Sequence, residues 1–539
     1  VGASALGAGS NAFGANSTAI STRSLASGAN TMALGFNASA TQADGVALGR
    51  GAASTGANSY ALGTLAQAKS TQAIAIGNGA VADSNNGGNN AGQAIAIGAN
   101  AYAHSQDSSA TGGNTAIAIG RNSYAELSGV AIGYGTQASQ GGAVAIGYAA
   151  NAKDSASGVA IGDWANATGN NAIAIGGNAG STATQANGNG AMAIGSGSKA
   201  SGTGAVALGG LGGTAGGSAA TKDFAVAIGA AAYATETGAV AIGGNSTNVS
   251  KASGKNSAAI GSNAQALAEN TLAFGTGSVA SQANSIAFGV NANAWGENTI
   301  SIGNGNKVTG RNSGAIGDPS IIDGANSYSV GNNNIIDSSV TDAFILGNTA
   351  NVNSSGGVAL GSNSVSATGS GVAGYSPLGT NNAAITATNS TTGAVAVGNA
   401  AKGVYRQITG LAAGTLDSDA VNVAQLKAAQ IHYFSVSSTG GNNYNNDGAI
   451  KPDAIAIGKN SLSNGTAGIA LGLNANVVSG NGVDSRGGIA IGEGSNSMAQ
   501  NATAMGANAY AMSTNSIAMG ANAVSGGDVT SFKSFANGT

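Results

Sequence analysis

The side chains that most often do chemistry are scarce in this sequence of 539 residues, and they do not cluster. There is no cysteine, and the two histidines, His104 and His432, lie far apart in the chain. A Cys–His site or a histidine-rich metal site is therefore excluded. We expect no enzyme activity, no catalytic residue, no cofactor and no bound metal.

Three weaker patterns have both a chemical and a structural interpretation. Asp417 and Asp419 could form a pair of catalytic carboxylates, but they also precede a helix-like run, where an acidic N-cap is common. The run GLGGTAGG at 210–217 is like a phosphate loop, but it lacks the lysine and precedes no helix. A calcium-binding β-roll needs acidic residues in register, and the 21 acidic residues here are not in register. We favour the structural interpretation of all three.

The composition is unlike that of an ordinary globular domain. Charged residues make up 7% of the chain and glycines number 92, whereas about a quarter of an average domain is charged. The net charge of −3 gives no basic field that would attract nucleic acid or an anionic membrane. No apolar run approaches the length of about 18 residues that a membrane span needs. These features predict a repetitive protein.

A short phrase recurs at an even spacing through most of the chain. Asn-Ser-Ile-Ala-Phe-Gly at 284–289 returns as Asn-Thr-Ile-Ser-Ile-Gly at 298–303. The glycines that close the phrase repeat at the same interval elsewhere, for example at 35, 49, 63 and 77. Longer gaps between phrases fall in Gly-, Asn-, Ser- and Thr-rich stretches. A fixed period with insertions confined to one part of it predicts a solenoid whose loops tolerate changes in length.

Alternation within the phrase predicts the two faces of a short strand. We expect the large apolar residues one and three before the phrase glycine to fill the interior of the coil. A second short strand, Ala-x-Ala, follows, with its alanines inside and its middle residue in solvent. The predicted interior pairs include Ile74/Ile76, Ile117/Ile119, Val144/Ile146, Leu272/Phe274 and Ile286/Phe288.

The residue two before each phrase glycine is almost always alanine, and we expect it to point away from the interior. Because a solvated face would vary more, uniformly small residues predict close packing against another copy of the chain. Ile345 breaks the pattern. The predicted trimer-interface residues are Ala75, Ala118, Ala145, Ala174, Ala241 and Ala287.

The repeat stops near residue 403 and resumes at DAIAIG, 453–458. Between them, the segment 403–433 contains a helix-like run in which Val423 and Leu426 could form one a/d pair of a coiled coil. We therefore predict three parts: a β-roll head with loop insertions at 1–402, a neck at 403–433, and a second head-like β-roll segment at 434–539, which we expect to be truncated.

The phrases at 284–289, 298–303 and 515–520 resemble the head repeat of trimeric autotransporter adhesins (YadA-like heads), whose consensus is Asn-Ser-Val-Ala-Ile-Gly. The residues 405–409 (Tyr-Arg-Gln-Ile-Thr) together with 419–427 (Asp-Ala-Val-Asn-Val-Ala-Gln-Leu-Lys) resemble the neck of the same family. Gly410 departs from that pattern, where the neck usually has Asn, and no long stalk follows Lys427. The residues that match the neck and that we single out are Arg406, Gln407, Ile408, Asp419, Val423 and Leu426.

This resemblance implies an all-β fold: a left-handed parallel β-roll, a solenoid of about 14 residues per coil, assembled as a homotrimer, with a neck that contains a short helix. It also implies an extracellular position on a Gram-negative cell surface, tethered to the outer membrane through a missing C-terminal anchor. The implied roles are cell adhesion, virulence and biofilm formation. Implied partners are host matrix or receptor glycoproteins, collagen-like ligands among them, or the protein itself.

Candidate binding residues are aromatic side chains on an otherwise small and polar surface, because aromatic residues are good interface anchors. A structural interpretation stays open for them: the tyrosines could cover neighbouring coils, and Trp295 could cap a turn. The candidates are Trp164, Trp295, Tyr102, Tyr124, Tyr233 and Tyr510. Loop insertions are also expected to protrude, at 81–93, 104–114, 179–190, 210–223, 244–256 and 478–487.

Two classes of function follow from these observations. The first is an adhesin head that binds host proteins through many weak contacts, which add by avidity. The alternative is a structural spacer or self-associating module without a host ligand. Ice binding would require a Thr-x-Thr ladder on one face, and the variable outward position lacks it.

Overall fold

The computed structural model describes residues 2–84, 93–104, 115–177, 183–210, 217–245, 247–376, 383–429, 435–478, 482–526 and the backbone of 535–537. The chain forms two compact units, Val1–Thr409 and Gly410–Thr539. Both units are built almost entirely from strands of two to four residues. The boundary between them falls inside the predicted neck.

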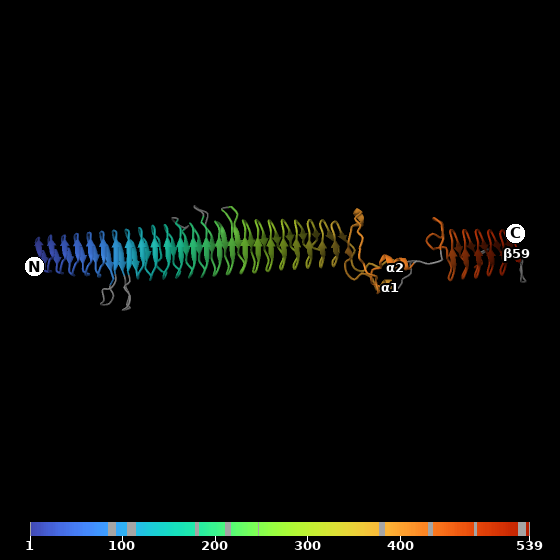
Figure 1. Ribbon diagram of the computed structural model, residues 1–539, viewed down its shortest axis with the longest axis horizontal. Helices are drawn as coiled ribbons and strands as arrows, with labels where there is room; N and C mark the ends of the chain where they lie inside the picture. The colour runs from blue at the N-terminus through green and yellow to red at the C-terminus, as the bar shows by residue number, and fades with distance from the viewer. Residues whose placement is uncertain are drawn as a thin grey trace. The chain divides into compact units, whose positions relative to one another are not determined.

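The first unit is a stack of coils in which two parallel sheets face each other. One is a 25-stranded sheet that runs from β1 (Ser4–Leu6) to β48 (Val395–Ala396). The facing sheet is in two sections, a 9-stranded one from β2 (Asn11–Ala12) to β18 (Gln137–Ala138) and a 14-stranded one from β21 (Asn166–Ala167) to β47 (Val365–Ser366). Most coils contribute one strand to each side (Figure 1), and between the two sections the facing side has only isolated bridges at Asn151. The all-β parallel solenoid predicted from the repeat is confirmed.

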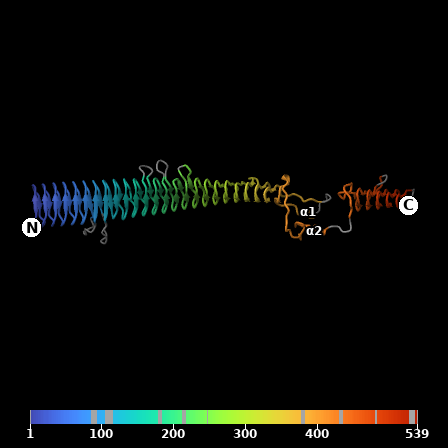
Figure 2. The ribbon, with the colours of Figure 1, turned by 45° about the horizontal axis from the view of Figure 1, so that its top comes forward.

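The register between coils follows the sequence period. Ser4 pairs with Thr18, one period later, in the first two strands of the large sheet. Where the chain carries an insertion the register is kept, because Ile74 pairs with Ile95 and Ile95 with Ile117. Insertions are therefore accommodated without interrupting the hydrogen-bonded ladder between strands. The coils of the first unit stack one after another in sequence order (Figure 2).

The predicted loops fall only partly on described residues. Segments 85–92, 105–114, 178–182, 211–216 and 479–481, within or overlapping them, lie outside the described part of the chain. Four predicted loop ranges also include strands of the ladder. These strands are β12 (Val81–Asp83), β23 (Gln185–Ala186), β27 (Ala219–Ala220) and β31 (Ser250–Ala252).

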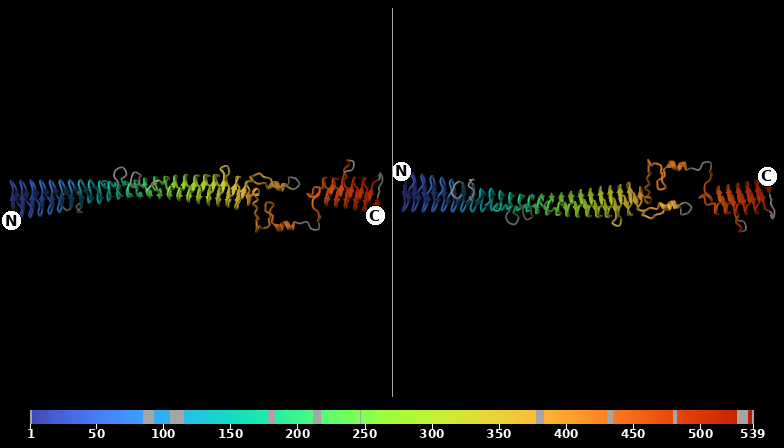
Figure 3. Two further views of the ribbon diagram at one scale, coloured as in Figure 1. Left: turned by 90° about the horizontal axis from the view of Figure 1, so that it is seen from above. Right: turned by 90° about the horizontal axis from the view of Figure 1, so that it is seen from below.

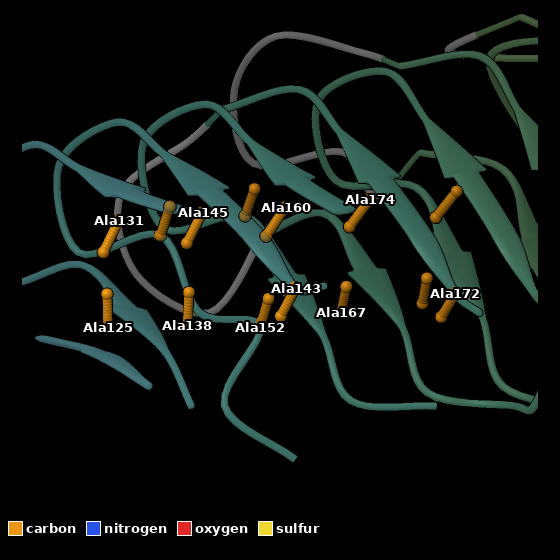
Figure 4. Packing of buried hydrophobic residues seen from close by; sticks show 14 of the residues in the cluster. Ala125, Ala131, Ala138, Ala143, Ala145, Ala152, Ala160, Ala167, Ala172 and Ala174 are labelled. Atoms are coloured by element: carbon orange, nitrogen blue, oxygen red, sulfur yellow. The ribbon is translucent and has the colours of Figure 1, made fainter. Parts of the chain in front are cut away.

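The interior of the coils is filled by alanine. Ala75, two residues before a phrase glycine, is fully buried, and so are Ala66 and Ala68 on the facing strand. Figure 4 shows such alanines from the two sheets meeting in the narrow space between them. The Ala-x-Ala strand is oriented as predicted, with its middle residue, Gln67 in this coil, half-buried on the outside.

The predicted orientation of the first strand is wrong. Ile74 is half-buried and Ile76 is exposed on the outside of the coil. The other pairs that we expected inside, Ile117/Ile119, Val144/Ile146, Leu272/Phe274 and Ile286/Phe288, have the same outward orientation. The prediction that alternate residues face opposite sides of the strand was correct, but the side assigned to each set was wrong. A shift by one residue exchanges the two faces of a strand. The physical reason is the width of the coil, since a period this short, divided among two strands and two turns, brings the sheets so close together that most coils hold only small side chains between them.

The predicted trimer-interface alanines are therefore corrected as well. Each is fully buried within its own chain and cannot touch a partner: Ala75, Ala118, Ala145, Ala174, Ala241 and Ala287. Their uniform size reflects the space inside the coil. Packing against another copy is not needed to explain it.

One stretch of the roll has larger side chains in its interior. Ile345, the exception noted in the sequence, is fully buried together with Ile322 and Ile336 from the facing sheet. Ser329 lies beside Ile345 in the ladder and supplies a smaller side chain. Larger residues on one side are thus offset by small residues nearby, so the interior stays filled.

Asparagine and serine stabilise the corners of the coils. Asn284 adopts a left-handed conformation, with φ of 58°, that asparagine tolerates better than most residues. Its Nδ2 donates to Oδ1 of Asn298 in the next coil at 3.0 Å, and Asn298 does the same to Asn312 at 2.9 Å. The buried hydroxyl of Ser285 donates to the carbonyl of Gln282 at 2.6 Å. These polar groups are therefore satisfied within a coil or by the neighbouring coil, as is usual for buried groups.

The phrase glycine is required by close approach as well as by conformation. Gly289 has φ of +133°, and a Cβ there would lie 2.2 Å from the carbonyl oxygen of Gly303 in the next coil. No other residue fits at this position.

The second unit repeats the architecture on a smaller scale. It contains a 6-stranded sheet from β49 (Ile455–Ile457) to β59 (Phe535–Asn537) and a 5-stranded sheet from β50 (Leu462–Ser463) to β58 (Val524–Ser525). The described helices of the whole chain are short: α1 (Ala383–Ala387), η2 (Ala400–Lys402) and α2 (Val423–Ala428). Views from above and below show the same short, repeated strands within each roll (Figure 3).

The narrow interior predicts an asymmetry between substitutions in one coil. Replacing the interior Ala287 by leucine should push the sheets apart and cost about 1–3 kcal/mol of stability. The matched control is Asn293→Leu, on the outside of the same coil, which should cost much less. Thermal unfolding and amide hydrogen exchange of residues 272–302 would measure both. If both substitutions reduced stability equally, the interior would not be as narrow as the buried alanines indicate.

Candidate functional site

The outer side of the 25-stranded sheet carries two columns of large apolar side chains, which we name the apolar face. They are the residues one and three before each phrase glycine. Phe274 and Phe288 are 42% and 46% exposed, and their rings stack with centroids 4.9 Å apart. Other exposed members of the face are Leu6, Ile20, Met32, Leu34, Tyr60, Ile76, Ile228, Ile316, Tyr328, Val330, Phe344 and Leu346. An apolar surface of this length marks an interaction site.

The outer side of the facing sheet has a different character. Its outward position is polar in about half of the strands and varies from one coil to the next. Polar residues there include Asn11, Ser39, Gln67, Gln137, Asn166, Gln185, Lys199, Lys251, Gln265, Asn293, Lys307 and Asn351. This sheet is suited to solvent, and the apolar face is the one that needs a partner.

Two of the candidate tyrosines belong to this polar side and cover each other. Tyr102 and Tyr124 lie in neighbouring coils and stack with centroids 5.2 Å apart. The hydroxyl of Tyr124 donates to the Glu126 carboxylate. Burial, and then this hydrogen bond, raise the pKa of Tyr124 above its usual value, so the phenol is a neutral donor at physiological pH. These contacts agree with the structural interpretation of the two tyrosines, in which each side chain covers its neighbour in the adjacent coil.

The remaining candidates on this side lie apart from one another. Tyr233 is half-buried and is in register with Lys251 in the next coil. Tyr510 belongs to the second unit and is exposed. Trp295 follows β37 (Asn293–Ala294); its backbone N–H donates to the Val308 carbonyl at 2.8 Å and its side chain is exposed. The structure does not bring these three residues together.

Trp164 lies in an aromatic cluster that the sequence analysis missed. Its ring is tilted against Tyr148 at 5.8 Å, and Tyr148 stacks on Tyr134 at 5.2 Å. The guanidinium of Arg121 lies 5.6 Å from the centroid of Tyr134. We call these four residues the aromatic corner. The sequence positions could have predicted this cluster. Arg121, Tyr134 and Tyr148 directly follow the phrase glycines of three consecutive coils, one residue in each coil.

Arg406 of the predicted neck closes the last coil of the first unit. Its guanidinium donates to the carbonyls of Val397 and Ser362, both at 2.6 Å, and to Oγ of Ser364 at 3.1 Å. A Cβ on Gly361 would lie 2.8 Å from Arg406 Cζ, so glycine leaves room for this contact. Gln407 and Ile408 follow in an exposed segment without regular structure.

The predicted N-cap of the neck helix is corrected. Neither Asp417 nor Asp419 caps α2; the cap is Asn422, whose side chain accepts from Gln425 N at 3.0 Å in a capping box. Asp419 instead accepts from the backbone N–H groups of Thr415 and Leu416, and these bonds lower the pKa of its carboxyl group. The sequence signal for the cap was Asn-x-x-Gln.

Val423 and Leu426 lie on α2 and are 65% and 67% exposed. Their spacing places them on one face of the helix. In a single chain nothing covers this pair, which is the arrangement expected of helices that associate with copies of themselves.

Within the described ranges, no three His, Asp or Glu side chains are placed to hold a metal ion. The part of the chain that the structure describes also contains no helix long and apolar enough to cross a membrane.

The Arg406 contacts predict a local effect on the end of the roll. Arg406→Ala should leave two carbonyls without their donor and reduce local stability by roughly 1 kcal/mol. Arg406→Lys should restore only part of it, because an ammonium lacks the planar fork. Hydrogen exchange in β46 (Val358–Leu360) and β48 (Val395–Ala396) measures the change. Wild-type protection in Arg406→Ala would contradict this role.

Comparison with known proteins agrees with this architecture. The family model described as the YadA head domain repeat matches more than half of the chain, at 1–20, 26–52, 54–80, 127–150, 155–179, 186–211, 220–246, 252–278, 280–306, 294–318, 449–475, 486–509 and 499–523. The model described as the coiled stalk of trimeric autotransporter adhesin matches 407–450.

Two curated relatives have similar segments. The chain is 50% identical over 110 residues to the trimeric autotransporter adhesin AtaA of Acinetobacter sp. (strain Tol 5), and 47% identical over 94 residues to the autotransporter adhesin BadA of Bartonella henselae. These matches cover 19% and 17% of this chain and 3% of each relative. With its head repeats, neck and parallel solenoid, the chain belongs to the YadA-like trimeric autotransporter adhesins.

Proposed function

We propose that this chain is the head of a homotrimeric adhesin on the surface of a Gram-negative bacterium, tethered to the outer membrane. The observation that carries the proposal is the apolar face, which extends along the 25-stranded sheet and is uncovered in the single chain. Three copies that pack these faces around a common axis would bury them, while the polar sheets of all three would face outward. The family membership supports the same assembly.

Such a trimer would present the same outer sheet and loops three times over, and again from coil to coil. Repeated weak contacts then add by avidity without any single deep pocket. We propose host matrix proteins or cell receptors as ligands, collagen-like ones among them. The alternative is a spacer or self-associating module for biofilm formation, which the weakly charged composition of the chain also suits.

The assembly is tested by placing charge on the apolar face. Phe274→Glu with Phe288→Glu should shift the protein from trimers toward 50.5 kDa monomers in light scattering or native mass spectrometry, because buried unpaired carboxylates are costly. The control is Gln265→Glu with Asn293→Glu, on the outer side of the facing sheet in the same coils. A double-phenylalanine variant that stays trimeric and equally heat-stable would show that the apolar face is not the interface.

Adhesion is tested separately on the assembled head. Purified trimer should bind at least one member of a panel of immobilised matrix proteins and receptor ectodomains, and the monomeric double-Glu variant should bind at least tenfold more weakly through lost avidity. Clumping of cells that display the head, with no binding to the panel, would favour the self-associating alternative. If the head shows no binding to the panel and the cells do not clump, both functions are refuted.

A further inference from the structure

Trp164 has a backbone conformation that suits its side chain poorly. Its φ is 61°, in the left-handed region, where a bulky residue is an outlier. The equivalent corner, two residues after a phrase glycine, holds Asn291 or Gly277 in other coils, and both residue types adopt this conformation more readily; Leu65, with φ of 59°, is another bulky residue at this position. Strain of this kind persists where the side chain has a use.

Packing does not explain the tryptophan. Its side chain remains 44% exposed although it contacts Tyr148 on one side. In the next coil, Gly177 takes the place of Asp163 and brings no side chain to that position. An asparagine would close the coil without strain, so the exposed indole calls for a ligand.

The aromatic corner already binds one cation. At its N-terminal end, the Arg121 guanidinium lies 5.6 Å from the centroid of the Tyr134 ring. A cation at this distance is attracted by the negative face of the ring. Tyr134 and Tyr148, 42% and 47% exposed, then continue the stack to Trp164.

The C-terminal end of the stack is also aromatic, and among the described residues no cation is found over the Trp164 ring. Indole is the most favourable aromatic group for a cation. Beside it, Asp163 accepts from the backbone N–H of Tyr148 at 3.2 Å, which holds the carboxylate at the corner. Asp163 takes part in none of the ion pairs found among the described residues. Its charge is therefore available to a partner.

The corner is also separate from the apolar face. The column directly after the phrase glycines includes charged residues such as Arg50, Arg121 and Asp163, whereas the column directly before them is apolar throughout this part of the chain. A trimer that packs the apolar faces together leaves such a mixed column at its rim, where interfaces are polar and wet.

We propose that Trp164 and Asp163 form a recognition site for a cationic side chain, arginine in the first place, of a partner protein. The guanidinium would lie over the indole and pair with the carboxylate. This inference names a contact within the proposed adhesive function, and its own evidence is the geometry of the aromatic corner.

Fluorescence can report on this site directly. The chain has two tryptophans, so Trp295→Phe leaves Trp164 as the single reporter. In this background, acrylamide should quench Trp164 in the assembled protein, and hexa-arginine should change its emission in a saturable manner that high salt weakens. Hexaglutamate should cause no change.

Substitutions in the otherwise wild-type chain then test the two residues. Trp164→Asn fits the corner as Asn291 does, and it should bind immobilised hexa-arginine at least tenfold more weakly while keeping wild-type thermal stability. Asp163→Asn should weaken binding at least threefold. Trp295→Phe is the matched control, since it removes an equally exposed tryptophan outside the corner and should leave binding unchanged.

Three results would overturn the proposal. They are undiminished binding by Trp164→Asn, a Trp164 that acrylamide cannot reach, and an emission change with chitotriose but not with hexa-arginine, which would indicate a sugar site instead. Failure of the proposed function is distinguishable, because loss of all adhesion with intact hexa-arginine binding would refute the adhesin role and leave this site in place.

Discussion

The separation of the two sheets is the constraint on which the rest of the structure depends. In most coils the space between the sheets admits little more than a methyl group on each strand, and alanine occupies it. Each buried methyl contributes little hydrophobic free energy. The stability of the roll must therefore come from many equivalent coils, each joined to its neighbours by a complete backbone ladder.

This constraint moves the large apolar side chains to the outside. In most proteins Ile, Leu and Phe form the core of the chain that carries them, but here they form the apolar face. In the proposed trimer, the core that they need lies between chains. A narrow interior and a face that requires a partner would then be two consequences of the same short coil, and the facing sheet and its corners would remain for recognition.

The period, the two-strand coil, the parallel stacking and the tolerance of insertions could all be predicted from the sequence, because each depends on spacing alone. The phase of the alternation could not. Ile74-Ala75-Ile76 is compatible with either face inward, and only the distance between the sheets decides that Ala75 is buried. Arg406 was identified as part of the neck, but its contacts with Val397 and Ser362 depend on how the chain returns to the last coil.

The candidate site was predictable in part for a similar reason. Trp164 was singled out as an exposed aromatic residue, while Tyr134 and Tyr148 were missed because they belong to the two preceding coils and become its neighbours only when the coils stack. The helix cap shows the opposite case. Asn422 and Gln425 have the spacing of a capping box, and that local pattern was a better guide than the acidic residues before it.

The ladder also determines how the head would respond to pulling. Hydrogen bonds between neighbouring coils run along the stack, so tension on its ends loads one layer of bonds at a time. Each coil that detaches would release up to about 45 Å of extended chain, in exchange for about 4.8 Å of stack. A single chain would therefore unfold stepwise, one coil after another, and would dissipate mechanical energy gradually. The coils that have not yet detached would keep their structure.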